Sequence, residues 1–333
     1  MSLLRNLDIL EVGAGGGYNA TATSAFGLRS MTLIDGSRAG FALLTQRAEE
    51  GAFNVKKLRI LHEDFTEYAV DNVFDVCICE GTIPGQGNPK AFLKKLSTNV
   101  RRGGFLIITC TTPSSILSEI FRRTLYSVIV STCGSRATQI CRSLFAQHLK
   151  SLSVRTRSVE DWIQDSIVHP WEHGKYVFSV SEAIAHLGAN FEFVHAIPSL
   201  TSELGWYKQY SGARERNRTV STIWEESDNT LLDRRVVAAS NVTAEYRRSC
   251  RNLLSLHDEI RDVYSDKKII EFCAEAKKFS RLLGPEFAVT KRAISEFDAL
   301  VKSILLKGTI PVSQGFGRWW GRAQIYVSFR RVA

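Results

Sequence analysis

The feature that most constrains this chain is a short apolar run that passes through an acidic residue into closely spaced glycines, Asp8-Ile-Leu-Glu-Val-Gly-Ala-Gly-Gly-Gly-Tyr18. A nearly continuous apolar run is typical of a central strand in a parallel sheet. Gly13, Gly15 and Gly17 allow a left-handed backbone and a close ligand approach where any Cβ would obstruct. The stretch therefore predicts a strand, a tight turn and a helix start that cradle a nucleotide-type ligand.

Residues 1–112 alternate strand and helix signals in the rhythm of a doubly wound α/β sheet. Three carboxylates, Asp35, Asp64 and Glu80, stand at the ends of successive predicted strands. In an open parallel sheet, ligands sit at the carboxyl ends of the strands, beside the point where the strand order reverses. We therefore expect these carboxylates to share the ligand edge with the glycines.

Together these motifs resemble those of the class I S-adenosylmethionine-dependent methyltransferases. The resemblance covers about residues 7–112 and rests on the glycine motif from Glu11, Asp35, Glu63-Asp-Phe65, Val73-Phe-Asp-Val and Arg102-Gly-Gly-Phe-Leu-Ile-Ile-Thr109. It implies a Rossmann-like sheet of seven strands and S-adenosyl-L-methionine as the cofactor.

The resemblance also implies roles for the cofactor-binding residues. Asp35 would accept hydrogen bonds from both ribose hydroxyls and Asp64 from the adenine amine, tasks that suit carboxylates. Glu80 would lie where the cofactor meets the methyl acceptor. The other implied contacts are Glu11 for the loop and the amino group, Gly13, Gly15 and Gly17 beneath the methionine and ribose, and Phe65 as a backbone donor or an apolar wall.

Two other nucleotide-linked folds fit less well. A dinucleotide-binding fold requires G-x-G-x-x-G, and Tyr18 occupies its last position here. The Asn/Asp-Pro-Pro-Tyr/Phe motif of amino-methylating DNA enzymes is replaced by Glu80-Gly-Thr-Ile-Pro-Gly85.

The class I methyltransferases usually have helices ahead of their first strand, whereas in this sequence residues 1–7 alone precede it. We expect that cover to come from later segments or from residues ahead of Met1.

The remainder of the chain suggests helical additions to this sheet. The expected organisation is a cofactor-binding core at 1–112, a helical substrate-side insertion at 113–190, a sixth strand with an aromatic segment at 191–212, a second helical insertion at 213–308 and a return strand at 309–333. The return strand would join the sheet as its antiparallel seventh member and complete the core.

Several residues are candidates for catalysis or acceptor binding. His169, His173 and Glu80 are candidate bases, since a hydroxyl acceptor must lose a proton. The two histidines are not expected to hold a metal, because proline and glycine interrupt a helix there and no further ligand is placed. Candidate substrate contacts are Trp171, Tyr176, Trp206, Arg318 and Trp319, with packing of the insertions as the equal alternative for the aromatic residues.

Charge and cysteine content narrow the class of protein. Residues 1–112 hold 12 Lys/Arg and 11 Asp/Glu, against 31 and 23 in the remainder. The basic second part fits either an anionic partner or a solvated face. Seven cysteines without a C-x-x-C pair indicate buried thiols and neither a zinc cage nor a disulfide framework. With no apolar run long enough for a spanning helix and no leader pattern, we expect a cytoplasmic protein.

The sequence thus predicts a methyltransferase that acts on an oxygen or nitrogen of a small or medium acceptor, anionic or sugar-containing. A nucleic-acid partner is not favoured, because no recognised binding motif is present. Two alternatives stay open: an RNA or protein methyltransferase that docks through its basic part, and a catalytically silent interaction subunit with a cofactor fold. The acceptor and the oligomeric state are not predicted.

Overall fold

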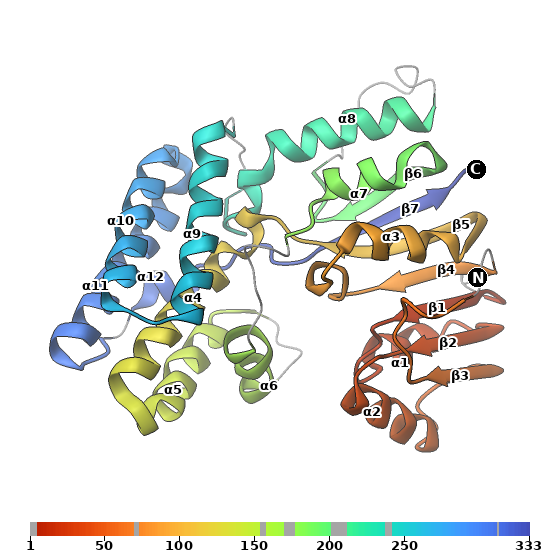
Figure 1. The fold of residues 1–333 in the computed structure, drawn as a ribbon, viewed down its shortest axis with the longest axis horizontal. Coiled ribbons are helices and arrows are strands. Elements are labelled where there is room, and N and C mark those ends of the chain that lie inside the picture. Colours follow the sequence, from red (N-terminus) through yellow and green to blue (C-terminus); the bar gives the residue numbers. More distant parts are fainter. Residues whose placement is uncertain are drawn as a thin grey trace. The chain divides into compact units, whose positions relative to one another are not determined.

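The computed structural model divides into two compact units, which are described one at a time (Figure 1). The sheet unit comprises Met1–Thr111, Phe178–Trp224 and Gln324–Ala333. The helical unit comprises Thr112–Val177 and Glu225–Ala323. The structure describes residues 5–69, 73–153, 158–169, 177–200, 212–236, 242–311 and 313–333.

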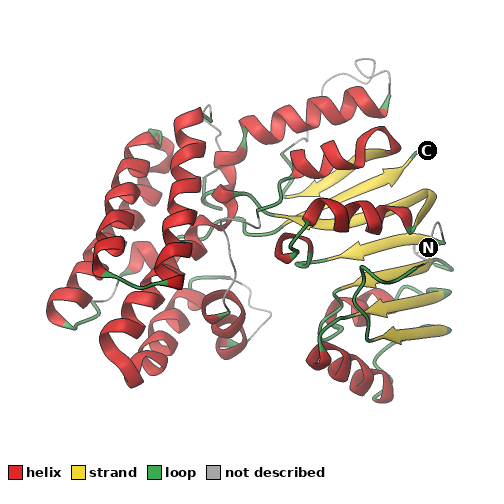
Figure 2. Cartoon of the chain, viewed as in Figure 1, coloured by secondary structure: helices red, strands yellow, loops and turns green. Residues whose placement is uncertain are grey.

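A single seven-stranded sheet organises the first unit (Figure 2). Its strands are β1 (Asp8–Val12), β2 (Ser30–Ile34), β3 (Lys57–Leu61), β4 (Phe74–Cys79), β5 (Val100–Cys110), β6 (Phe191–Ile197) and β7 (Ile325–Arg331). Their order is β3-β2-β1-β4-β5-β7-β6, and β7 is antiparallel to both neighbours. The predicted seven-stranded α/β sheet, with its antiparallel return strand, is confirmed.

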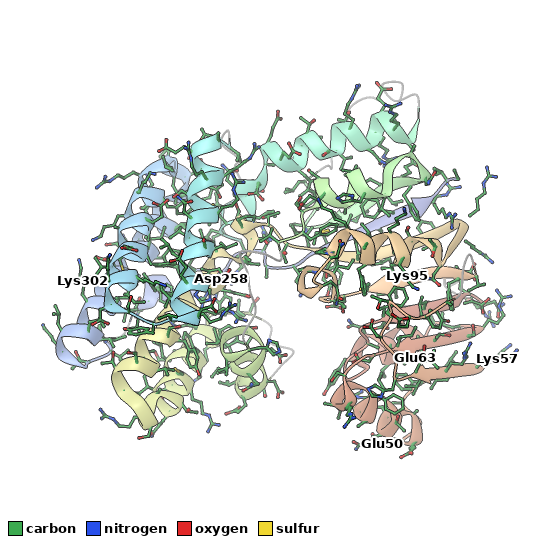
Figure 3. The ribbon with its side chains drawn as sticks, in the orientation of Figure 1. Glu50, Lys57, Glu63, Lys95, Asp258 and Lys302 are labelled. Carbon is green, nitrogen blue, oxygen red and sulfur yellow. The ribbon has the colours of Figure 1, made fainter. Side chains whose placement is uncertain are left out.

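Helices flank this sheet. They are α1 (Tyr18–Ser24), α2 (Arg38–Glu49), α3 (Pro89–Thr98), α7 (Val180–Leu187) and α8 (Ala213–Glu226). Ser37 caps α2, and its hydroxyl accepts a hydrogen bond from the backbone N–H of Gly40. Apolar residues of β1, β2 and β4, among them Ile9 and Leu33, form the core beneath α1 and α2. Charged side chains such as Glu50 and Lys57 are exposed (Figure 3).

The expected domain boundaries differ from the observed units. Residues 178–190 and 213–224 belong to the sheet unit instead of the helical insertions, because α7 packs against α3 and α8 is bonded to β6. Asn217 of α8 accepts from the backbone N–H of Phe193 and donates to the carbonyl of Phe191. This amide satisfies the backbone of an edge strand, which would otherwise offer unpaired groups.

The helical unit is built from α4 (Pro113–Cys133), α5 (Ala137–Lys150), α6 (Val159–Ile163), α9 (Ala244–Asp262), α10 (Asp266–Leu282), α11 (Ala288–Lys307) and α12 (Gln314–Arg318). Short helical turns elsewhere in the chain lie at Ile83–Gly85, Gly134–Arg136, Gln164–Val168, Gly188–Asn190, Asp228–Leu231 and Pro285–Phe287. The aromatic centre of the helical unit's core is Phe121, whose ring packs edge-on against the rings of Phe272 and Phe297. None of the described helices combines the length and the apolar character needed to cross a bilayer.

Candidate active site

The glycine loop follows β1 at the point where the strand order reverses. Gly13, Gly15 and Gly17 all adopt positive φ angles, +73°, +53° and +72°. A Cβ added at Gly13 would lie 2.0 Å from Oγ1 of Thr82, so this glycine allows a close backbone approach. A Cβ at Gly15 would meet nothing within 4 Å among the described residues. The loop therefore packs tightly at its first glycine and leaves open space at its second.

Asp35 lies directly after β2 and is 8% exposed. Its Oδ2 accepts a 2.7 Å hydrogen bond from the backbone N–H of Gly15, and its Oδ1 accepts one of 2.8 Å from Ser37. Each carboxylate oxygen has two lone pairs, so one on each remains for a ligand hydroxyl. Asp35 thereby fixes the glycine loop and can still accept two further hydrogen bonds.

Glu11, on β1, is the most unusual group of this edge. Its side chain is 3% exposed, and Oε2 has no hydrogen-bond partner among the residues that the structure describes. Burial, and secondarily the charge of Glu80, raises the pKa of Glu11 to about 7. A buried carboxylate without a partner is costly unless a cation neutralises it. This orphaned acceptor therefore suits a positively charged ligand group.

Glu80 stands immediately after β4, where three segments meet. Its Oε2 accepts from the side-chain amide of Asn19 on α1, and its Oε1 accepts from the hydroxyl of Tyr326 on β7. The next residue, Gly81, donates its backbone N–H to Oγ1 of Thr109 at 2.7 Å. Sequence reasoning missed Asn19, Thr109 and Tyr326. The alternation of β7 could indicate only that Tyr326 faces away from its buried neighbours.

Asp64 and Phe65 follow β3. Asp64 is exposed, and its Oδ1 accepts 2.8 Å hydrogen bonds from the backbone N–H and the hydroxyl of Thr66. These bonds lower the pKa of Asp64. Phe65 is buried, with its ring centroid 5.2 Å from that of Phe92. Phe65 therefore fits the role of an apolar wall, and the adenine contacts of both residues stay predictions.

The geometry of this edge agrees with a sequence comparison. Residues 10–108 match the family model described as a methyltransferase domain. Residues 10–108 form a methyltransferase domain. Its seven-stranded sheet has the Rossmann-like form that the resemblance implies.

Curated relatives match about a third of the chain. It is 33% identical to EEF1A lysine methyltransferase 2 from Danio rerio over 132 residues, 36% of this chain and 55% of the relative. It is 32% identical to ubiquinone biosynthesis O-methyltransferase from Rickettsia akari (strain Hartford) over 106 residues, 32% of this chain and 41% of the relative. The chain thus spans about half or less of the length of these relatives.

One similar solved structure is the methyltransferase from Thiobacillus denitrificans in complex with S-adenosyl-L-homocysteine. It is 22% identical, covers 32% of this chain and 43% of that chain, and has a TM-score of 0.29.

The structure describes some of the candidate residues that lie after the methyltransferase domain in the sequence, but not all of them. His169 ends a helical turn of the helical unit, where its backbone carbonyl accepts from the guanidinium of Arg123. Its role as a base stays a prediction. Arg318 is exposed at the end of α12. Four candidates lie outside the described residues: Trp171, His173, Tyr176 and Trp206.

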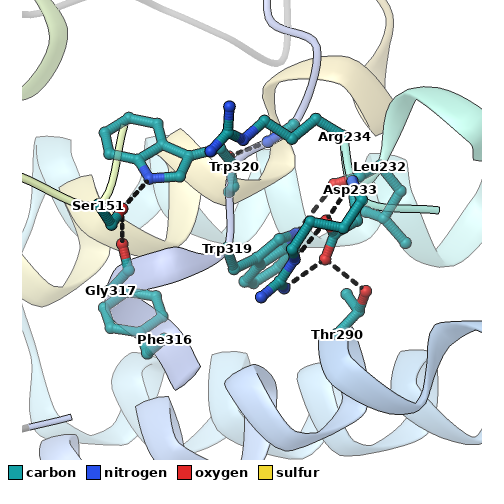
Figure 4. A network of polar contacts seen from close by, with 12 residues as sticks. Ser151, Leu232, Asp233, Arg234, Thr290, Phe316, Gly317, Trp319 and Trp320 are labelled. Carbon is teal, nitrogen blue, oxygen red and sulfur yellow. Dashed lines mark hydrogen bonds and ion pairs between the residues drawn. The ribbon is translucent and has the colours of Figure 1, made fainter. Parts of the chain in front are cut away.

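The structure corrects the expectation for Trp319. Its side chain is 0% exposed, and its Nε1 donates a 2.9 Å hydrogen bond to the carbonyl of Leu232 (Figure 4). Trp320 is 7% exposed and donates its Nε1 to Oγ of Ser151. Both indoles anchor the helical unit, because they fill its core with their N–H groups satisfied. Trp319 has no surface on which a substrate ring could stack.

The cysteines behave as small core residues. Cys77 and Cys79 share one face of β4 and are both 0% exposed. Burial raises the pKa of the Cys79 thiol to about 12, so the protonated form persists at neutral pH. Within the described ranges, no group of three or more His, Cys, Asp or Glu side chains could hold a metal ion.

Proposed function

We propose that this chain is an S-adenosylmethionine-dependent methyltransferase that acts on an oxygen or nitrogen of a small or medium acceptor. The observation that carries the proposal is the buried Glu11 carboxyl, which lacks a partner for Oε2 beside the glycine loop. The cofactor carries a cationic amino group and a sulfonium at its methionine end. Both the charge of this end and the open space at Gly15 fit the site.

Each residue of the cradle has a role in holding the cofactor. Glu11 and Glu80 face its cationic end, and Asp35 accepts from the ribose hydroxyls through its free lone pairs. Asp64 and Phe65 contact the adenine. The bound cofactor supplies a methyl group that its sulfonium has already activated. The chain therefore contributes mainly alignment of the acceptor against that methyl group.

A hydroxyl acceptor also requires a group that takes its proton. Glu80 is the base candidate in the sheet unit, since its carboxylate is partly exposed at the ligand edge. His169 and His173 are the other base candidates. Arg318, together with Trp171, Tyr176 and Trp206, is proposed to contact the acceptor.

The proposed acceptor is anionic or sugar-containing. The excess of basic residues after residue 112 supports this choice, because a positive field attracts anionic ligands. The names of the relatives include both an O-methyltransferase and a protein lysine methyltransferase. The test must therefore separate small acceptors from macromolecules.

The experiment is incubation of the full chain with methyl-labelled S-adenosylmethionine and a cell extract that is fractionated into metabolites, proteins and nucleic acids. We expect the label to appear in the metabolite fraction. The Asp35→Ala variant, tested in parallel, should transfer little label. Transfer into the protein or nucleic-acid fraction alone would overturn the small-acceptor proposal in favour of a macromolecular substrate.

A further inference from the structure

The Glu80 carboxylate joins two segments that lie far apart in the chain. Asn19 is the second residue of α1, which begins directly after Gly17 of the glycine loop. Tyr326 is the second residue of β7 and lies 246 positions after Glu80 in the sequence. Each donor occupies a different carboxylate oxygen. Glu80 is therefore held between the glycine-loop helix and the return strand.

The start of β7 lies at the ligand edge of the sheet. Because β7 is antiparallel, Tyr326 pairs with Thr109 near the carboxyl end of β5. Both residues of this pair form hydrogen bonds with the turn after β4: Thr109 accepts from the backbone N–H of Gly81, and Tyr326 donates to Glu80. Two adjacent residues of neighbouring strands thus fix both the backbone and the side chain of the turn.

Glu80 and Glu11 lie close together at this edge. Glu11 pairs with Ile78 in the parallel β1–β4 ladder, and Glu80 comes two residues after Ile78, just past the end of β4. The charge of Glu80 contributes to the raised pKa of Glu11, so the two carboxyl groups interact. Two adjacent carboxylates, one of them buried with an unpartnered oxygen, repel each other unless a cation binds both.

We propose that Tyr326, together with Asn19, is a positioning residue that holds Glu80 toward Glu11, so that the two carboxylates form one subsite for the cationic end of the bound cofactor. This inference rests on the proposed function. It assigns a role in cofactor selectivity to β7, which returns to the sheet after the helical unit. The subsite discriminates ligands with a charged amino acid end from neutral adenosine derivatives.

The test is calorimetric titration of Tyr326→Phe, which removes only the hydroxyl. The two probes are S-adenosylhomocysteine and methylthioadenosine, which share the nucleoside and the thioether but differ in the charged amino acid end. We expect the affinity for S-adenosylhomocysteine to fall about tenfold or more, as for a lost hydrogen bond to a charged group. The affinity for methylthioadenosine should stay at the wild-type value.

If Tyr326 had a merely structural role, Tyr326→Phe would lower the affinity for both ligands by the same factor, and that result would overturn the inference. Unchanged affinities for both ligands would overturn it as well. Tyr264→Phe is the matched control, because its hydroxyl donates a 3.0 Å hydrogen bond to Asp266 in the helical unit. It should change neither affinity.

Glu80→Gln supplies the second arm. It should reproduce the selective loss, and adding Tyr326→Phe to it should cause no further loss, because the charge that the Tyr326 hydroxyl positions is already absent. Additive losses would contradict positioning through Glu80. Failure of the wild-type protein to bind either probe would contradict the proposed function and this inference with it, whereas wild-type binding with equal losses contradicts the inference alone.

Discussion

The backbone N–H of Gly15 donates a 2.7 Å hydrogen bond to Oδ2 of Asp35, which ties the loop after β1 to the end of β2. The other carboxylate oxygen accepts from Ser37, at the start of α2. One side chain thus organises the glycine loop and the helix that follows the second strand, and keeps a lone pair on each oxygen for a ligand.

Replacement of Asp35 by alanine should weaken cofactor binding strongly. We expect a loss of about thirtyfold or more in affinity for S-adenosylhomocysteine, since two hydrogen bonds to a charged group and the loop anchor vanish together. Calorimetry measures the loss. Asp233→Ala is the matched control, because this buried carboxylate of the helical unit also accepts from a backbone N–H. It should lower stability and leave the affinity unchanged, and an unchanged affinity in Asp35→Ala would contradict the ribose assignment.

Alanine substitutions at Gly13 and Gly15 should have different effects on stability and on ligand affinity. At Gly13 the new Cβ would lie 2.0 Å from Thr82, and the positive φ adds strain, so we expect a loss of about 2 kcal/mol or more in unfolding free energy. At Gly15 the space is open, so only the cost of positive φ, about 1 kcal/mol, should appear.

Ligand affinity distinguishes Gly15→Ala from the wild type more clearly than stability does. Gly15→Ala places a methyl group in the space where we expect the cofactor, so its affinity for S-adenosylhomocysteine should fall more than its stability predicts. Urea denaturation and calorimetry give the two quantities. If Gly15→Ala and the wild type bound the ligand with equal affinity, the ligand would not occupy the space beside Gly15.

Glu11 should make the stability of the ligand-free protein pH-dependent. Its pKa is about 7 when folded, against 4.5 as the ordinary value, so the folded state binds the proton more tightly. The unfolding free energy therefore falls as pH rises from about 4.5 to about 7, by about 3 kcal/mol from this group, and then levels off. Glu11→Gln should lack this component, so its stability relative to the wild type should rise across that window in urea denaturation. A constant difference between the two proteins would contradict the assignment.

Ligand binding should show the opposite trend. A cation beside Glu11 favours its ionised form, so the affinity for S-adenosylhomocysteine should increase as pH rises through about 7, with release of a proton below that value. Titrations in buffers of different ionisation enthalpy measure the released proton. In Glu11→Gln the affinity should be lower and nearly independent of pH over the same range, and proton release by this variant equal to the wild type would point to another group.

The glycine motif and the strand-end carboxylates could be predicted from the sequence because they depend on local spacing. The contact between Glu80 and Tyr326 could not, since it depends on the register of an antiparallel strand 246 positions away. The Arg-Arg-Gly-Gly segment at residues 101–104 has the composition of a turn, yet it lies within β5. It is absorbed as an irregularity in the ladder, where a Cβ on Gly104 would lie 2.7 Å from the carbonyl of Asp75.

The tryptophan pair near the chain end illustrates a different limit. A pattern of arginine and tryptophan suits a binding surface and a core equally, and burial alone separates the two. Trp319 is fully buried, and its backbone carbonyl accepts a 2.7 Å hydrogen bond from the equally buried guanidinium of Arg122. The same guanidinium lies 3.9 Å from the ring centroid of Trp320. These tertiary partners carry no signature in the sequence.

Arg122→Met should destabilise the helical unit. It removes a buried cation that also donates to Nδ1 of His148, and it leaves the carbonyl of Trp319 without its donor. We expect a loss of about 3 kcal/mol or more in unfolding free energy. Arg142→Met is the matched control, because its ion pair with Glu160 is exposed and should contribute about 0.5 kcal/mol or less. Equal small effects of both variants would show that the buried network contributes little.

Direct titration of the full chain with S-adenosylmethionine tests the central claim. The site built from the glycine loop, Glu11 and Asp35 predicts saturable binding that S-adenosylhomocysteine displaces and that Asp35→Ala largely abolishes. No detectable binding by the folded wild-type protein, or binding that Asp35→Ala leaves intact, would contradict the account.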